Sequence, residues 1–148
     1  MKKLTTILAA LAVLLLVQGC AGKNRAPRLV LLGEGTCQDT TTGQVWQGNK
    51  SATPLASLEE THAYIARLNQ ESTAKGWRLP TAAELYELND LFDRHLNGQC
   101  LMDRKGHFWT GESSGEGMVG SFEPGATCDP GEQYIPRTGG GYVRAVRP

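Results

Sequence analysis

The stretch Gly76-Trp77-Arg78-Leu79-Pro80-Thr81-Ala82-Ala83-Glu84-Leu85 carries the clearest folding signal in the chain. Thr81 and Glu84 have the spacing of a capping box, in which each side chain accepts the other residue's backbone N–H. Apolar residues then recur at helical spacing, at Leu85, Leu88, Leu91, Phe92 and Leu96. This pattern predicts an amphipathic helix that begins after Thr81 and ends before Asn97-Gly98.

A second helix is predicted upstream of this stretch. Ser57-Leu58-Glu59-Glu60 again has the form of a capping box. Leu58, His62, Ile65 and Leu68 follow at helical spacing, with Tyr64 beside them. This spacing places His62 on the apolar face, where a packed histidine is far commoner than a metal ligand.

The segments on either side of the helices indicate strands. Residues 36–47 predict a hairpin that turns at Thr42-Gly43, after a short apolar run at residues 29–32. Beyond Gly98 the sequence is rich in glycine, and its apolar pieces are short. A hairpin followed by two helices and further strands predicts an α+β domain rather than a βαβ repeat.

Composition excludes several classes of protein. The chain has 148 residues, with 15 Lys+Arg against 15 Asp+Glu, 40% hydrophobic and 7% aromatic residues. This composition predicts one globular domain. A nucleic-acid-binding protein would need a basic surface, so nucleic acid is not expected as a partner.

The N-terminal residues indicate a cell-envelope protein. Two lysines precede an apolar run over residues 7–17, which is too short for a membrane span but suits a signal peptide. The run ends in Val17-Gln18-Gly19-Cys20, which resembles the lipobox of bacterial lipoproteins. The resemblance implies a signal peptide at 1–19 and a lipid on Cys20. The alternative is an ordinary secretory peptide that happens to end in cysteine.

Residues 20–28 are small, polar and basic, which is typical of a tether, and the folded domain is expected over 29–148. The residue after Cys20 is Ala21, and no aspartate stands there as an inner-membrane retention signal, so delivery to the outer membrane is expected. Two or three acyl chains would hold such a protein firmly at the membrane.

Three cysteines remain after lipidation, and an oxidising compartment predicts at least one disulfide. Cys100 and Cys128 both lie in turn-rich sequence that flanks a predicted strand region, so we expect these two to pair. Cys37 alternates with polar neighbours and could be a small buried hydrophobic residue.

Four segments together resemble a known family. They are residues 35–47, Gly76-Trp77-Arg78-Leu79-Pro80-Thr81, Phe108-Trp109-Thr110 and Tyr142-Val143-Arg144-Ala145-Val146-Arg147. Their order and spacing are similar to the Lcl C-terminal domain family over nearly all of residues 33–148. The resemblance implies a C-type-lectin-like fold with two helices packed on a twisted antiparallel sheet. The C-terminal strand would lie beside the first strand, and the connecting loops would be long and glycine-rich.

The sequence offers no clear catalytic or metal-binding motif. The three histidines share no short ligand spacing, and Glu123-Pro124-Gly125 lacks the third residue of a lectin calcium turn. Ser113-Ser114 has no indicated histidine partner. Trp77 and Arg78 are interpreted as structural, with Trp77 in the core and Arg78 paired with Glu84. We therefore expect no metal, no cofactor and no enzymatic activity.

These observations predict a lipid-anchored envelope module that binds a glycan, a cell-wall component or another envelope protein. A structural subunit without its own ligand is the alternative, and an enzyme is the third reading. The glycine-rich region from 111 to 141 is long, polar and acidic, which favours a binding role and a neutral or cationic ligand rather than a sulfated one. The expected binding surface comprises Trp109, Glu112, Glu116, Glu123, Asp129 and Glu132.

Overall fold

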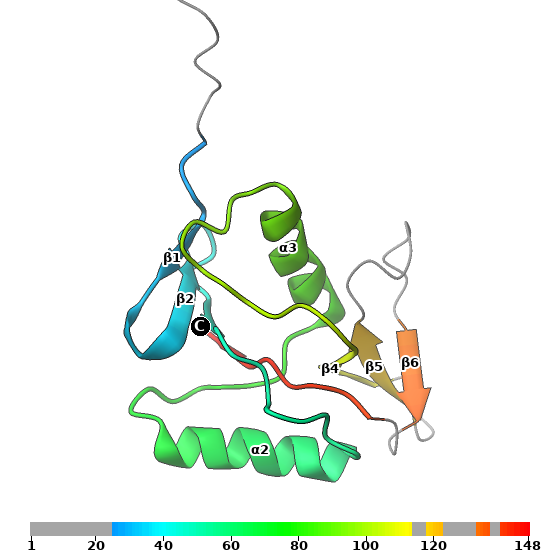
Figure 1. The fold of residues 1–148 in the computed structure, drawn as a ribbon. Coiled ribbons are helices and arrows are strands. Elements are labelled where there is room, and N and C mark those ends of the chain that lie inside the picture. The colour runs from blue at the N-terminus through cyan, green and yellow to red at the C-terminus, as the bar shows by residue number, and fades with distance from the viewer. Residues whose placement is uncertain (1–24, 114–117, 123–132, 137–139) are drawn as a thin grey trace, which may run out of the picture.

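The structure is a computed structural model that describes residues 25–113, 118–122, 133–136 and 140–148. Two helices and two antiparallel sheets form an α+β domain, which confirms the predicted class (Figure 1). Most of the glycine-rich loop region lies outside the described residues. The elements are β1 Leu29–Leu31, the 3-10 turn η2 Gly33–Gly35, β2 Thr36–Asp39, β3 Val45–Gln47, α2 Leu58–Glu71, α3 Ala82–Asp93, β4 Phe108–Ser113, β5 Met118–Phe122, β6 Gln133–Pro136 and β7 Val146–Arg147.

The larger sheet has the strand order β1-β2-β3-β7, and β4-β5-β6 form the smaller one. The predicted hairpin is confirmed as β2 and β3, in which Cys37 lies opposite Trp46. The C-terminal strand was expected beside the first strand, but β7 pairs with β3 at the other edge. The outer edge of β1 is already occupied, because the N–H groups of Arg28 and Leu29 donate to the carbonyl of Leu96.

The helix α2 begins where its capping residue predicts. The Ser57 hydroxyl accepts the backbone N–H of Glu60 at 3.2 Å. The prediction for His62 is wrong, because His62 is exposed and the neighbouring Thr61 is the fully buried residue. The Thr61 hydroxyl donates to the Ser57 carbonyl inside the helix, so this residue can turn inward without losing a hydrogen-bond partner.

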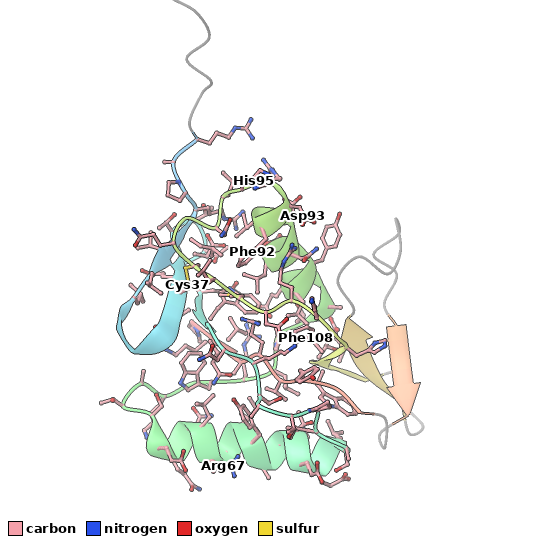
Figure 2. All side chains as sticks on the ribbon, in the orientation of Figure 1. Cys37, Arg67, Phe92, Asp93, His95 and Phe108 are labelled. Atoms are coloured by element: carbon pink, nitrogen blue, oxygen red, sulfur yellow. A yellow bond between two sulfur atoms is a disulfide. The ribbon has the colours of Figure 1, made fainter. Side chains whose placement is uncertain are left out.

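The helix α3 also has the predicted start, with both hydrogen bonds of the Thr81–Glu84 capping box present. It ends at Asp93, earlier than expected. His95 adopts a positive φ of 56° just past the helix end, which turns the chain and lets Leu96 pack against the same core (Figure 2). Neither helix in the described part of the chain is long and apolar enough to cross a membrane.

The two helices pack against opposite faces of the four-stranded sheet (Figure 1). Side chains alternate between faces along each strand, so neighbouring residues enter different cores. Trp46 and Val146 pack with the leucines of α3, whereas Val45 and Ala145 pack with Trp77 and with Ile65 and Leu68 of α2. The sheet therefore has an α3 face and an α2 face.

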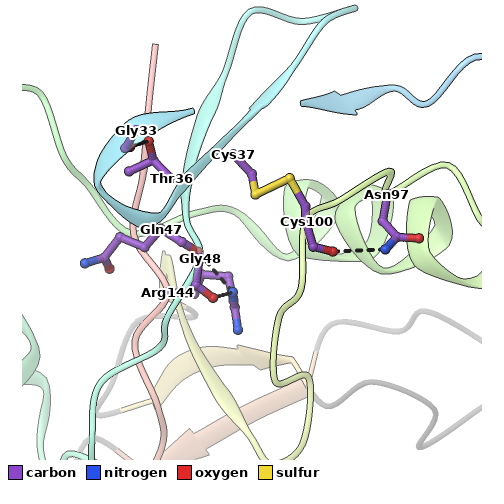
Figure 3. Close-up of a disulfide and its surroundings, with 8 residues drawn as sticks. All are labelled: Gly33, Thr36, Cys37, Gln47, Gly48, Asn97, Cys100 and Arg144. Carbon is purple, nitrogen blue, oxygen red and sulfur yellow. Dashed lines mark hydrogen bonds between the residues drawn. A yellow bond between two sulfur atoms is a disulfide. The ribbon is translucent and has the colours of Figure 1, made fainter. Parts of the chain in front are cut away.

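One disulfide joins β2 to the segment that follows α3. It links Cys37 to Cys100, whose Cα atoms are 6.2 Å apart, so the predicted Cys100–Cys128 pairing is wrong (Figure 3). Cys37 points to the α3 face, and the chain after α3 passes directly over it. The Asn97 side chain fixes that passage by donating to the Cys100 carbonyl at 2.9 Å. Cys128 lies outside the described residues.

Candidate functional site

The binding surface expected from the sequence is not assembled by the described residues. Trp109 is fully buried, and its indole N–H donates to the Leu55 carbonyl at 3.3 Å, so it belongs to the core. Glu112 is half-buried and accepts the backbone N–H of Ala82 at 2.9 Å, at the start of α3. Both residues therefore have structural roles. The other four lie outside the described residues, namely Glu116, Glu123, Asp129 and Glu132.

A pocket of about 210 Å³ opens instead where the α2 face of the sheet meets the C-terminal end of α2. Its walls come from the β2–β3 hairpin, from the end of α2 with the segment that follows it, and from β7. The β4–β5–β6 sheet lies toward the other end of α2, near its N-terminus (Figure 1). The pocket is thus separate from Trp109 and Glu112, the two described residues of the surface that the sequence suggested.

The hairpin wall is polar and held in place. Thr36 and Gln47 lie opposite each other in the register, on the other side of the hairpin from Cys37 (Figure 3). The Gln47 amide donates to the Tyr64 hydroxyl at 3.2 Å and accepts the Ala145 N–H at 2.9 Å. Gly48 follows, and a Cβ at this position would collide with the Gly35 carbonyl oxygen, so the turn requires glycine.

The opposite wall is built around Trp77, which is 5% exposed, as the structural interpretation predicted. The Asn69 amide exchanges two hydrogen bonds with the Trp77 backbone, at 2.8 and 2.9 Å. The Trp77 indole N–H donates to the Ser72 hydroxyl at 3.3 Å. These contacts fix the indole between α2 and the sheet, so the pocket is formed before any ligand arrives.

The neighbouring Arg78 forms the predicted pair with Glu84, at 2.6 and 2.8 Å. Hydrogen bonds from Arg78 and from the Thr81 backbone lower the pKa of Glu84 to about 2. Gln44 also donates to this carboxylate, at 2.6 Å. Arg78 is therefore committed to the start of α3, as the structural interpretation requires.

Arg147, the arginine in the pocket wall, has fewer hydrogen-bond partners than Arg78. Its guanidinium lies over the Trp77 ring, 5.3 Å from the centroid, and Nη1 donates to the Pro148 oxygen at 3.3 Å. The Nε atom is buried and has no hydrogen-bond partner. None of the described Asp and Glu side chains lies within ion-pair distance of Arg147.

Arg144 shows what a structural arginine looks like in this domain. It is 2% exposed and donates to three backbone carbonyls, those of Gln47, Gly48 and Asp103, at 2.6 to 3.0 Å. Burial, which disfavours the charged form, lowers the pKa of Arg144 to about 10. Its three hydrogen bonds to carbonyls hold the guanidinium within the fold, whereas Arg147 donates one hydrogen bond, to Pro148.

The polar lining of the pocket consists of hydrogen-bonding groups and one cation. Its described lining offers hydroxyl, amide, indole and guanidinium groups, and it includes no His, Cys, Asp or Glu that could act as a nucleophile or general base. Across the described ranges, no three His, Cys, Asp or Glu residues gather where they could hold a metal ion. A second cavity beside α3 is about 20 Å³, which is room for a single water molecule.

The pocket escaped sequence reasoning because its walls come from segments that are distant in the chain. The sequence indicates structural roles for Trp77 and its neighbour Arg78, and nothing near them in the chain points to a second arginine. The arginine that does lie over Trp77 is Arg147, seventy positions later. One signal was available, since alternation along residues 145–147 places Arg147 on the same face as Ala145 and away from Val146.

Comparison with known proteins places the whole pocket inside one family domain. No curated protein matches the chain. The family model of the Lcl C-terminal domain matches residues 35–147, which is most of the chain and reaches from the first pocket residue, Gly35, to the last, Arg147. The chain therefore belongs to the Lcl C-terminal domain family.

Proposed function

We propose that the protein is a lipid-anchored module of the bacterial envelope that binds a glycan without catalysing a reaction. The observation that carries this proposal is the preformed polar pocket between the hairpin and the end of α2. Sugar hydroxyls require several fixed hydrogen-bond donors and acceptors, and side chains already held by the fold provide them at little entropic cost.

The size of the pocket suits one sugar ring rather than a larger ligand. Its volume of about 210 Å³ is below the roughly 300–1,000 Å³ that drug-sized ligands occupy. Asn49 is exposed at the edge of the pocket, where its amide can reach a second ring of a chain. We therefore favour the terminal unit of a glycan, including a cell-wall glycan, over a large protein partner.

The anchoring part of the proposal rests on the sequence. With a lipid on Cys20, residues 20–28 would span at most about 30 Å before β1 begins at Leu29. A tether of this length would keep the pocket close to the membrane, which we propose to be the outer membrane. The glycans within that reach are those of the envelope itself.

A glycan array with the full-length protein in detergent tests the binding proposal. Ala74 lines the pocket, so Ala74→Phe should fill it and abolish reproducible hits. Ala63 is exposed elsewhere on α2, and Ala63→Phe adds the same side chain as a matched control. Hits that survive in Ala74→Phe, or a wild-type protein without hits, would count against the proposal.

Fractionation of cells tests the anchor separately. Cys20→Ser should move the protein out of the membrane fraction or leave it unprocessed, because no sulfur remains to carry the diacylglycerol. Mass spectrometry of the wild-type protein should show an acylated N-terminal cysteine. If the Cys20→Ser protein is still acylated and membrane-bound, the lipobox interpretation is wrong.

A further inference from the structure

We infer that the ligand of this pocket is an acidic sugar, whose single carboxylate pairs with Arg147 beside Trp77; this inference rests on the proposed function. The sequence suggested a neutral or cationic ligand for the glycine-rich region at 111–141, and none of the described residues of that region lines this pocket. The pocket has its own charge and its own chemistry, set by the residues that line it.

The first argument compares Arg147 with the other described arginines. Four of them pair with carboxylates within the fold, namely Arg28, Arg78, Arg94 and Arg104. Arg147 is half-buried in a pocket wall, with a buried Nε that has no partner. A partly buried cation without an Asp or Glu partner costs free energy, and a bound carboxylate would reduce that cost.

The second argument concerns the charge around the pocket. The C-terminal end of a helix carries a partial negative charge, which would disfavour an anion near the end of α2. Here the Lys75 ammonium donates to the carbonyls of Asn69, Gln70 and Ser72 at 2.6 to 3.1 Å, which offsets that charge. Glu71 is exposed and does not line the pocket. Arg147 is the only charged side chain in the described lining, so an anion there meets a cation.

The third argument distinguishes a carboxylate from a polyanion. A planar guanidinium matches a carboxylate through two parallel N–H···O bonds, and one arginine balances one negative charge. The indole beneath Arg147 restricts the orientation of the guanidinium plane. The remaining polar groups, on Thr36, Gln47 and Asn49, are neutral and suit the hydroxyl or amide groups of a sugar ring. A sulfated polymer would require several cations along its path.

Calorimetric titration of the full-length protein with two pairs of sugars tests the inference. N-acetylmuramic acid differs from N-acetylglucosamine by a lactyl ether that carries the carboxylate, and glucuronic acid differs from glucose by its carboxylate. We expect the acid of at least one pair to bind about 10-fold or more tightly than its neutral partner, as a charged hydrogen-bonded pair would give. The pair in which the acid binds more tightly shows at which position of the sugar ring the pocket accepts a carboxylate.

Variants of Arg147 link that preference to the pocket. Arg147→Gln should abolish the preference for the acid, and Arg147→Lys should retain part of it, because lysine keeps the charge but loses the planar fork. Arg94→Gln removes an exposed arginine from an ion pair on α3 and should leave all affinities unchanged. Thermal melts of each variant check that the fold is retained.

The outcomes separate this inference from the proposed function. If acidic and neutral sugars bind equally and Arg147→Gln has no effect, glycan binding stands and the carboxylate assignment is wrong. If neither sugar of either pair binds and the array is also blank, the proposed function fails as well. An acid preference that persists in both Arg147 variants would place the acidic ligand outside this pocket and overturn the inference.

Discussion

The two faces of the four-stranded sheet use the same short strands for different purposes. On the α3 face, Trp46 and Val146 are almost completely buried against the leucines of α3, and the Cys37–Cys100 disulfide closes the layer. On the α2 face, a small apolar cluster around Trp77 gives way to the polar pocket. Because side chains alternate, one strand can stabilise the domain with one residue and line the pocket with the next.

Of the features that distinguish the two faces, the disulfide should contribute most to the free energy of unfolding. Replacing both Cys37 and Cys100 with alanine reopens a loop of 63 residues, which should lower the free energy of unfolding by about 4 kcal/mol in the chain-entropy model. Denaturant unfolding of wild type and variant measures the loss. Cys128→Ser is the control, and a comparable loss there would mean that the pairing in solution differs from the one described.

Truncation of one leucine on each side of the sheet compares the two faces directly. Leu91 is buried in the α3 layer, so Leu91→Ala should cost about 3 kcal/mol. Leu68 of α2 is only partly buried and borders the pocket, so Leu68→Ala should cost about 1 kcal/mol and disturb ligand binding instead. Equal losses of stability would contradict the division of roles between the faces.

Acid titration examines the ion pair at the start of α3. The pKa of Glu84 is lowered to about 2, so its stabilising effect is fully present above its ordinary pKa and is lost as the pH falls from about 5 toward 2. Since Arg78 is nearly half exposed, we expect Glu84→Gln to cost only about 1–2 kcal/mol at neutral pH. The variant should also lose this part of the acid dependence in thermal melts. If Glu84→Gln keeps the wild-type pH profile, the loss of stability in acid comes from other carboxyl groups.

The smallest effect should come from the pocket arginine. Arg147→Gln removes a stacking contact with Trp77 but also relieves a buried, unpartnered Nε, so the free energy of unfolding should change by less than about 0.5 kcal/mol. Arg144→Gln, at the buried arginine three residues earlier, should cost about 2–3 kcal/mol because three backbone carbonyls lose their donor. A large loss of unfolding free energy in Arg147→Gln would show that Arg147 stabilises the fold, contrary to this prediction.

Local features of the fold could be predicted from the sequence because their causes are local. Both helices begin where Ser57 and Thr81 predict, and each cap lies within four residues. The box is complete only at Thr81–Glu84, because the Glu60 carboxylate accepts the Ala56 N–H instead of the Ser57 N–H. The hairpin and the pairing of Arg78 with Glu84 likewise involve residues close in the chain. The end of α3 was predicted too late. The apolar pattern continues through Leu96, but the helix ends at Asp93 and His95 has a positive φ.

Features that depend on distant segments could not be predicted in this way. The disulfide joins Cys37 to Cys100 only because the chain after α3 folds back over β2. Tryptophan is a residue type that is common in binding sites, yet the side chain of Trp109 is fully buried in the core. The pocket combines a hairpin, a helix end and the last strand, and no motif within one segment encodes that combination.

The position of the disulfide also determines how the domain would respond to mechanical tension between a membrane anchor and a captured ligand. A pull on the N-terminal end would act first on β1, whose three residue pairs with β2 can separate one after another like a zipper. At Cys37 the pull would reach the covalent crosslink to Cys100, and the enclosed segment, with β3 and both helices, could not lengthen. Extension would therefore stop after residues 29–36 had straightened, about 25 Å of chain, with the interior of the domain still folded.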